Sequence, residues 1–192
     1  MYEVEVKLRA AHDAVRPALD DAGADRIGGV TQIDTYYDAP HRDFAATDEA
    51  LRLREERPAD DEAEGSGEEP DADATTKVTY KGPLVDADSK TREEHETAVD
   101  DVEAARGIFE GLGFEPAAVV EKHRTFFEID GYTVTLDRVA DLGEFVEVEA
   151  EAESERDVDA VREGAFDVLQ RLDLDPDDQI RTSYLGLLLD GE

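Results

Sequence analysis

Charged side chains alternate with apolar ones along several short segments of the chain. Glu3, Glu5 and Lys7 fall on one side of the first segment and Val4 and Val6 on the other, which is the period-two pattern of a β-strand. Together with later segments, these faces hold nine basic residues (Lys7, Arg9, Arg52, Arg54, Lys77, Lys81, Arg92, Lys122 and Arg124) and seven acidic ones (Glu3, Glu5, Glu94, Glu96, Asp137, Glu147 and Glu149). Carboxylates bind hard divalent cations, and Arg and Lys bind phosphate oxygens, so these faces predict a metal-assisted phosphate site.

The basic charge on these faces differs from the composition of the whole chain. The sequence has 20 basic and 52 acidic residues and a formal net charge of −32, yet the faces hold four of its five lysines. One interpretation is the solvated outer face of a half-buried sheet, which accounts for the alternation but not for the lysines. We favour a closed barrel with the charge inside and the apolar faces outside, under helices. Such a cavity is costly unless a polyanion such as a triphosphate completes it.

Eight segments carry strand signals: Tyr2–Arg9, Thr31–Asp38, Ala50–Glu56, Thr76–Lys81, Arg92–Val99, Val119–Asp130, Tyr132–Arg138 and Glu144–Ala150. Asp130 and Gly131 lie between two of them and predict a tight hairpin turn, because Gly tolerates positive φ. No parallel crossovers separate the strands. The expected fold class is therefore α+β, mainly β: an eight-stranded antiparallel closed barrel with a charged lumen and helices packed outside.

Four further segments predict helices: Asp13–Ala22, Asp101–Leu112, Ser154–Leu172 and a last one that starts at Pro176. Asp13 is the expected cap of the first helix, which puts Pro17 in its first turn, and Ser154 is the expected cap of the third. The last helix carries Ile180, Tyr184 and Leu187 at helical spacing. Ser183 and Tyr184 then either belong to a lid that closes one end of the barrel or simply pack.

Composition excludes several other functions. The strong acidity would repel nucleic acid and anionic membrane surfaces. The absence of cysteine removes disulfides, thiolate catalysis and thiolate metal sites. No signal peptide and no apolar run of ~20 residues is visible, so we expect a soluble cytoplasmic protein whose residues 1–192 form a single domain. There is no P-loop motif, and His12, His41, His95 and His123 lack metal-ligand spacing.

The acidity is spread along the chain rather than gathered in one tail. A diffuse carboxylate surface is typical of a protein that works in high salt, where repulsion is screened; the alternative is an acidic docking surface for a basic partner. The segment from Pro58 to Ala74 has eight acidic residues and no basic or aromatic one. We expect residues 58–74 to form a flexible acidic loop insertion, the alternative being a functional lid.

Several motifs follow one another in a characteristic order: Glu3–Lys7 (ExExK), Asp34–Asp38, Leu51–Arg54, Thr79–Pro83, Arg92–Glu96, Lys122–Arg124, Leu136–Val139, Leu142–Glu149 and Ser183–Tyr184. ExExK alone is a weak signal in an acidic chain, whereas the ordered set spans nearly the whole sequence. The set resembles the CYTH, or triphosphate tunnel metalloenzyme, superfamily, and most of all its class IV adenylyl cyclases. This resemblance implies an eight-stranded antiparallel tunnel that binds triphosphate compounds with divalent metal.

The resemblance also implies roles by position. The implied metal ligands, direct or through bound water, are Glu3, Glu5, Asp137, Glu147 and Glu149. The implied phosphate ligands are Lys7, Arg52, Arg54, Lys81, Lys122 and Arg124, with Arg92, Glu94 and Glu96 shared between phosphate contact and ordering of the cations. Glu5, Lys7, Arg124 and Asp137 are the expected catalytic group, and the expected cofactor is Mg²⁺ or Mn²⁺, two ions per site.

The implied activity is that of an adenylate cyclase, in which the ribose 3′-hydroxyl of ATP attacks the α-phosphorus and expels pyrophosphate. A metal-dependent triphosphatase acting on inorganic triphosphate, thiamine triphosphate or a nucleotide is the nearest alternative, and a non-catalytic binder of polyphosphate or nucleotide is the third. The expected partner is ATP or another triphosphate, without nucleic acid or membrane, and a homodimer is left open.

Overall fold

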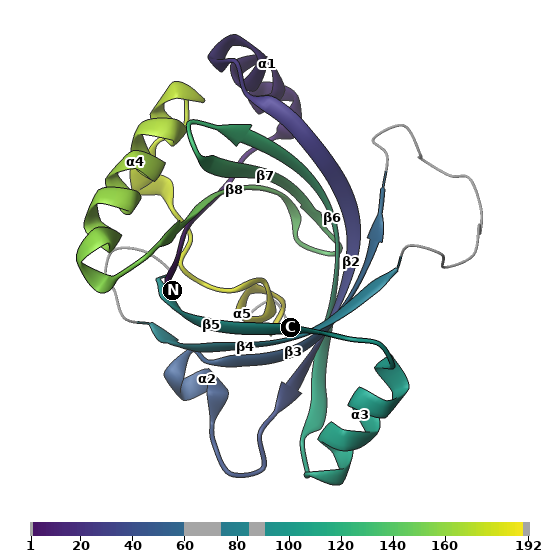
Figure 1. Cartoon of the computed structure of the whole chain (residues 1–192). Coiled ribbons are helices and arrows are strands. Elements are labelled where there is room, and N and C mark those ends of the chain that lie inside the picture. The colour runs from purple at the N-terminus through teal and green to yellow at the C-terminus, as the bar shows by residue number, and fades with distance from the viewer. Residues whose placement is uncertain (1, 60–73, 85–90, 190–192) are drawn as a thin grey trace.

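Eight antiparallel strands form a closed barrel in the computed structural model, which describes residues 2–59, 74–84 and 91–189 (Figure 1). The strands are β1 (Tyr2–Arg9), β2 (Asp25–Asp38), β3 (Ala50–Pro58), β4 (Thr75–Leu84), β5 (Arg92–Val99), β6 (Glu115–Ile129), β7 (Tyr132–Val139) and β8 (Gly143–Ala152). Their order around the barrel is β1-β5-β4-β3-β2-β6-β7-β8, and every neighbouring pair is antiparallel. The predicted fold class is confirmed.

The hairpin between β6 and β7 has the predicted turn. Asp130 and Gly131 both have positive φ, 52° and 82°, as a two-residue turn of this kind requires. β2 and β6 are longer than predicted, because each pairs with the other beyond the segments that carry strand signals. Their added ends contain Gly28, Gly29 and Pro116, residues that weaken a strand signal. At Gly29 a Cβ atom would lie 2.8 Å from the carbonyl oxygen of Ala59, so no side chain fits there.

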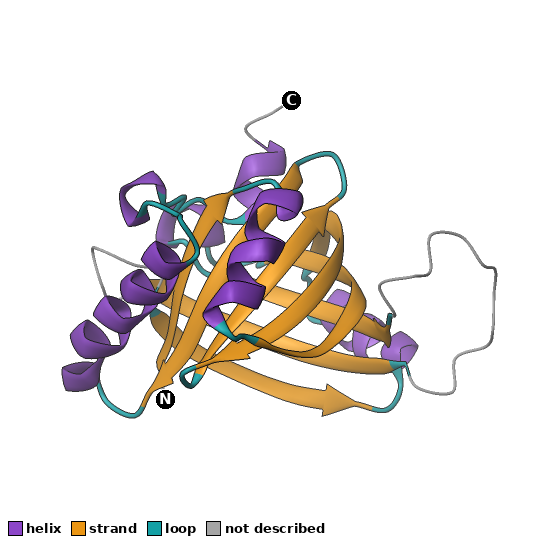
Figure 2. Cartoon of the chain, turned by 90° about the horizontal axis from the view of Figure 1, so that it is seen from above, coloured by secondary structure: helices purple, strands orange, loops and turns teal. Residues whose placement is uncertain are grey.

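Helices cover the outside of the barrel and one of its openings (Figure 2). They are α1 (His12–Ala22), α2 (Phe44–Thr47), α3 (Val102–Gly111), α4 (Val158–Arg171) and α5 (Tyr184–Leu189), with 3₁₀ turns at Glu155–Asp157 and Pro176–Asp178. Leu8 of β1 packs in one apolar cluster with Leu19 of α1 and Leu169 of α4. Leu53 of β3 packs in another with Ala105 of α3. Each fully buried leucine contributes about 1.5–3 kcal/mol, so the apolar strand faces are stabilised from outside.

The helix starts differ from those predicted. α1 begins one residue early at His12, whose backbone N–H donates to the Glu144 carboxylate, so Asp13 is not its cap and Pro17 lies beyond the first turn. The Ser154 hydroxyl donates to Asp157 rather than capping a helix, and a 3₁₀ turn precedes α4. At α1 a side-chain contact from outside the helix thus replaces the expected local cap, whereas at α4 no side-chain cap hydrogen bond forms.

The prediction of one helix from Pro176 onward is wrong. Only a 3₁₀ turn forms at Pro176, and α5 starts at Tyr184 after a segment without helix. The backbone N–H of Ile180 in this segment donates to the carbonyl of Lys7 at 2.6 Å, which ties the chain to β1. Seen along the barrel in Figure 1, α5 then lies across one opening.

Two further expectations concern the chain as a whole. Of the predicted acidic loop, residues 58–74, the part from 60 to 73 is not among the described residues. Within the described part of the chain, no helix has both the length and the apolar character of a membrane-spanning segment.

Candidate active site

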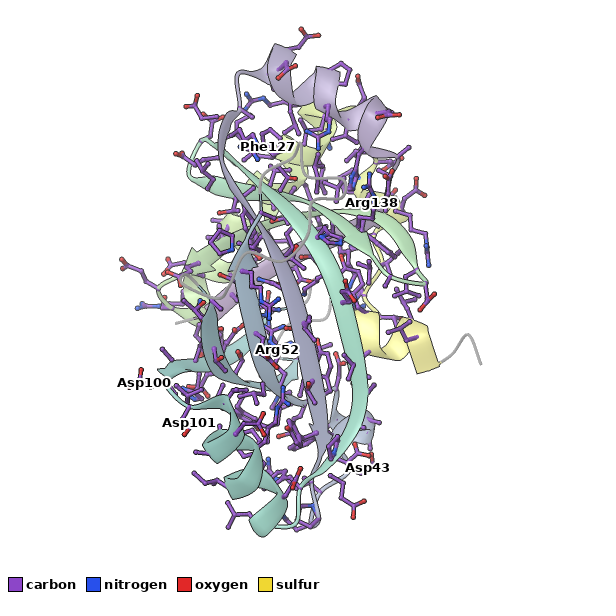
Figure 3. All side chains as sticks on the ribbon, turned by 90° about the vertical axis from the view of Figure 1, so that its right-hand side faces the viewer. Asp43, Arg52, Asp100, Asp101, Phe127 and Arg138 are labelled. Atoms are coloured by element: carbon purple, nitrogen blue, oxygen red, sulfur yellow. The ribbon has the colours of Figure 1, made fainter. Side chains whose placement is uncertain are left out.

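Most of the charged strand faces point into the barrel, as predicted, and line a tunnel with a volume of about 250 Å³. Arg9 is an exception, because it is exposed and donates to the backbone carbonyl of Leu142. Eight basic residues line it: Lys7, Arg52, Arg54, Lys77, Lys81, Arg92, Lys122 and Arg124. Eight acidic residues line it too: Glu3, Glu5, Asp48, Glu49, Glu94, Glu96, Glu147 and Glu149. Arg52, labelled in Figure 3, lies among the strands, whereas Arg138 is on the outside. The tunnel therefore gathers four of the five lysines of a strongly acidic chain.

Two arginines in the tunnel are fixed by bidentate contacts with buried aspartates. Arg54 donates to Asp34 through Nε and a terminal nitrogen at 2.6 and 2.8 Å. Arg124 does the same to Asp137 at 2.6 and 2.9 Å and also contacts Glu147. Burial would raise the pKa of Asp34, but the surrounding cations outweigh it and hold this pKa well below its usual range. These arginines are thus held in fixed positions before any ligand arrives.

Two other tunnel cations are much less engaged. Arg52 lies 3.6 Å from Asp34 and 4.0 Å from Glu94, and its Nε has no hydrogen-bond partner among the described residues. Lys7 forms no ion pair with a described carboxylate and lies 4.1 Å from the centre of the Tyr184 ring. A buried donor without a partner is costly, so Arg52 is suited to an anionic ligand. Lys7, which pairs with no described carboxylate, is suited to one by its charge.

The remaining lysines of the tunnel each pair with a carboxylate. Lys81 contacts Glu3 at 2.6 Å and Glu94 at 2.8 Å. Lys122 contacts Asp34 at 3.2 Å, yet its pKa is lowered to about 7 because burial, together with the charges of Arg54 and Arg124, outweighs that contact. Lys122 is thus a cation that titrates near neutrality.

Three of the five predicted metal ligands come together. One carboxylate oxygen each of Glu3, Glu5 and Glu149 lies within 4.8 Å of the others. Burial, and then the neighbouring charges of Glu3, Glu147 and Glu5, raise the pKa of Glu149 to about 7. The cluster thus carries like charges that a bound cation would neutralise, and its hard oxygen ligands suit Mg²⁺ or Mn²⁺.

The other two predicted metal ligands are engaged elsewhere. Asp137 and Glu147 both contact Arg124, and Asp137 also accepts a hydrogen bond from Tyr184. The structure therefore separates the five carboxylates into two sets. One is the cluster of three, of which Glu3 pairs with Lys81, and the other is a pair that positions an arginine.

Arg92 lies in the tunnel wall, but its donors are already used. One terminal nitrogen donates to the backbone carbonyl of Asp48 and, at 3.5 Å, to that of Gly82; the other donates to the Asp48 carboxylate at 2.8 Å. Asp48 ends α2 in the left-handed conformation, with φ of 54°. Arg92 therefore holds the turn between α2 and β3 and has little capacity left for a phosphate.

Two further residues lie in the site. The sequence predicts no role for Asp34, and it predicts that Tyr184 is either part of a lid or a packing residue. Asp34 is fully buried and contacts Arg52, Arg54 and Lys122. Asp34 and Tyr36 are two residues apart on β2 and therefore share a face of the strand, the one that lines the tunnel. The period-two pattern of β2 could thus have identified Asp34 as a lumen residue. The Tyr184 hydroxyl donates to Asp137 at 2.9 Å, which places the start of α5 in the tunnel wall.

Two histidines on the barrel strands lie outside the site. His95 and His123 are exposed, and His123 Nδ1 lies 2.9 Å from the Thr31 hydroxyl. Both alternate with lumen-facing residues of their strands and therefore point outward.

Comparisons with known proteins agree with this geometry. The CYTH domain profile matches residues 1–184. A Methanocaldococcus jannaschii protein named "Putative adenylate cyclase MJ0240" is 36% identical over 188 residues, which is 97% of this chain and 98% of that protein. The PH1819 protein of Pyrococcus horikoshii has a TM-score of 0.86 and 33% identity, with 99% of each chain covered. A Hippeastrum protein named "Putative adenylyl cyclase HpAC1", which is described as having a dominant triphosphatase activity, shares the fold at a TM-score of 0.63 and 16% identity, over 100% of this chain and 96% of that one.

Proposed function

Because this chain belongs to the CYTH domain family, we propose that it is a class IV-type adenylate cyclase that converts ATP to cyclic AMP and pyrophosphate. The observation that carries the proposal is the tunnel, where buried cations without full pairing face a cluster of three carboxylates. The likeness over 97% of this chain to a protein named "Putative adenylate cyclase MJ0240" supports this reaction among those that a triphosphate tunnel could perform.

In the proposed complex, the triphosphate lies along the tunnel between the cations. Arg52 and Lys7, which have the fewest competing contacts, bind phosphate oxygens directly. Arg54 and Arg124 are kept in place by Asp34 and Asp137 and offer their remaining donors. Their fixed positions reduce the entropy that binding must overcome.

Glu3, Glu5 and Glu149 would hold the divalent cation. When bound, Mg²⁺ or Mn²⁺ supplies charge neutralisation at the phosphates and lowers the pKa of the attacking hydroxyl. A second ion would need Asp137 or Glu147 to turn away from Arg124, since both contact it. We propose two ions on the strength of the family resemblance.

In the proposed reaction, the ribose 3′-oxygen gives up its proton to solvent water and forms a bond with the α-phosphorus, and the bond from that phosphorus to the bridging oxygen of the pyrophosphate breaks. Negative charge accumulates on the leaving pyrophosphate. Arg52, Lys7 and Lys81 lie in the tunnel wall that surrounds it and stabilise that charge. Catalysis on this account depends on positioning and electrostatics.

A metal-dependent triphosphatase is the second candidate, because a protein with the same fold is described as having that activity. Water would then attack the terminal phosphorus in the same tunnel. A non-catalytic anion binder is disfavoured, since acidic residues in its cavity would weaken binding.

One assay separates the candidates. Purified protein in high salt is incubated with ATP and Mn²⁺, and the products are resolved by chromatography. A cyclase yields cyclic AMP and pyrophosphate. ADP and orthophosphate would instead establish the triphosphatase, and tight ATP binding without products would establish a binder.

A further inference from the structure

One strand of the barrel is paired on both sides over only part of its length. β4 pairs with β5 from Glu94 to Val99, whereas β1 pairs only with the first two residues of β5, Arg92 and Glu93. In Figure 1, β1 and β5 meet beside the label N and run apart from there. From Glu94 to Val99, the side of β5 that faces away from β4 therefore has no partner among the described strands, and we call this side the β5 edge.

The β5 edge is open to other molecules. Residues His95–Ala98 are all exposed. Because N–H and C=O groups along an antiparallel strand point alternately to either side, about half of those from Glu94 to Val99 point away from β4. Outside the helices and strand ladders, no backbone hydrogen bond between described residues involves this stretch. These groups can therefore pair with the backbone of another strand.

The β5 edge is also long enough to hold a strand. At about 3.3 Å per residue, the stretch from Glu94 to Val99 spans about 20 Å, which is a usual strand length. A peptide that adds to a sheet edge gains affinity from backbone hydrogen bonds and specificity from its alternate side chains. The surroundings of those side chains therefore determine which partner fits.

On the lumen side, the β5 edge borders a cavity with a volume of about 640 Å³. The described residues that line it are Glu3, Glu94, Glu96, Gly131, Thr133, Glu149, Ala150 and Glu151. Five of these residues are glutamates, and none of them is basic or aromatic. We call this space the acidic cavity. It attracts cationic groups and repels anionic ones.

Part of the negative charge in the acidic cavity is not compensated within the protein. Lysines of β4 pair with the glutamates of β1 and β5. Glu149 and Glu151 of β8, in contrast, form no ion pair with a cation in the described part of the chain. A cationic side chain that enters from outside can therefore interact with these two carboxylates without displacing an existing partner.

A second copy of this chain does not fit the β5 edge. If two such edges paired antiparallel, Glu93, Glu94 and Glu96 of one copy would lie close to those of the other, and like charges that face each other across strands are destabilising. The net charge of −32 opposes the encounter as well. By the same reasoning an acidic segment is repelled, whereas a basic one is attracted.

We propose that the β5 edge and the acidic cavity together bind an extended basic segment of another protein. The segment adds as a strand beside residues 94–99, and every second side chain, a lysine or an arginine, enters the acidic cavity. Backbone hydrogen bonds form with almost any sequence, so the acidic cavity is what selects for positive charge. This interaction does not depend on the reaction in the tunnel.

The probe for this interaction is a synthetic peptide of Thr-Lys repeats, about eight residues long, with blocked ends. It is titrated by calorimetry in about 0.1 M salt, where charges still act over about 10 Å. The same peptide N-methylated at every residue keeps the charge but donates no backbone hydrogen bond, and a Thr-Glu peptide reverses the charge. Hydrogen exchange followed by mass spectrometry shows where the peptide binds.

Two protein variants complete the test. Glu151→Gln removes a charge from the acidic cavity at an exposed position, so the fold is not disturbed. Glu121→Gln is the matched control, since Glu121 is an exposed strand glutamate that does not line the acidic cavity. We expect Glu151→Gln to weaken binding of the Thr-Lys peptide about threefold and Glu121→Gln to leave it unchanged.

We expect the Thr-Lys peptide to bind about tenfold more tightly than either control peptide and to slow amide exchange from Glu94 to Val99. Equal binding of the N-methylated peptide, or unchanged exchange at the β5 edge, would mean that charge alone attracts the peptide and would overturn the proposal. Exchange at the β5 edge that slows with rising protein concentration, without peptide, would make a second copy the occupant and overturn it as well.

Discussion

The cations of the tunnel differ in how completely the protein itself satisfies them. Arg124 is held by two buried carboxylates, whereas Arg52 has only distant ones and an unpartnered Nε. A side chain of the first kind positions the site, and one of the second kind is available to a ligand. The two kinds should respond differently to substitution.

For Arg52→Gln we expect tripolyphosphate affinity to fall about 10- to 100-fold with little loss of stability, because Asp34 keeps Arg54 and Lys122 as partners. Arg124→Gln should lower the free energy of unfolding by about 3–5 kcal/mol, since it leaves Asp137 and Glu147 buried without their cation. Calorimetric titration and urea unfolding measure the two effects. Equal stability losses in both variants would contradict this division.

Glu5→Gln tests the carboxylate cluster. The amide keeps the size of the side chain but removes one of the three negative charges that would hold the cation. We expect turnover with Mn²⁺ to be abolished and the thermal unfolding midpoint to be unchanged or slightly raised, because like-charge repulsion falls. Glu121→Gln, an exposed carboxylate on β6, is the control. Full activity in Glu5→Gln would remove this residue from the metal site.

Lys122 makes phosphate binding dependent on pH. Its pKa is about 7 in the folded protein, so it is charged below that pH and neutral above it. Bound phosphate favours the charged form, and tripolyphosphate affinity should therefore fall by up to about tenfold per pH unit as the pH rises above 7. The same shift means that Lys122 opposes folding as the pH falls from about 10 to about 7, where the unfolded chain takes up the proton first.

The comparison with Lys122→Arg isolates this effect from the titration of the ligand itself. An arginine stays charged throughout this range, so the decline in affinity between about pH 7 and 9 should be shallower in the variant. Calorimetric titrations at several pH values give both slopes. Identical slopes would show that Lys122 does not titrate on binding.

At the scale of elements, the strands and turns that depend on local sequence could be predicted. Alternation located every strand, and the positive φ that Asp130 and Gly131 tolerate located the hairpin. Predictions failed where a contact with a residue distant in the sequence determines the local structure. The apolar spacing of Ile180, Tyr184 and Leu187 fits a helix, but the N–H of Ile180 donates to β1 instead. α2 has only four residues, too few for a periodic signal.

The same limit applies to the candidate site. Residue type and strand face were enough to place the cations and carboxylates in one lumen. They could not tell that Asp137 and Glu147 would hold Arg124 while Glu3, Glu5 and Glu149 meet one another, since that depends on how far neighbouring strands are staggered around the barrel. The contribution of Tyr184 depends in turn on the path of a segment predicted wrongly.

Tyr184 links the C-terminal element to the tunnel, and Tyr184→Phe tests that link. The variant keeps the ring beside Lys7 but removes the hydrogen bond to Asp137, which orients Arg124. We expect kcat to fall about tenfold while tripolyphosphate affinity stays within about twofold, because position rather than charge is lost. Steady-state kinetics and calorimetry measure the two. Unchanged kcat would mean that the hydroxyl only fills space.

At the scale of the whole molecule, the tunnel and the rest of the protein differ in charge. Basic and acidic residues are equal in number along the tunnel, so the net charge of −32 resides elsewhere in the chain. That excess repels itself and disfavours the compact state, and it also disfavours the approach of a triphosphate. Screening by salt should relieve both effects, since the Debye length falls from about 14 Å at 0.05 M to about 3 Å at 1 M.

We therefore expect the thermal unfolding midpoint to rise steadily between about 0.05 M and 1 M KCl, with most of the rise at the low end, where screening changes fastest. The association rate of tripolyphosphate should rise over the same range instead of falling, because the long-range field of the molecule opposes an anion although the tunnel attracts it. Sorbitol at matched osmolality controls for preferential hydration. If sorbitol raises the unfolding midpoint as much as KCl does, surface repulsion is not what limits stability. If the association rate falls with salt, the tunnel cations dominate the approach of the anion.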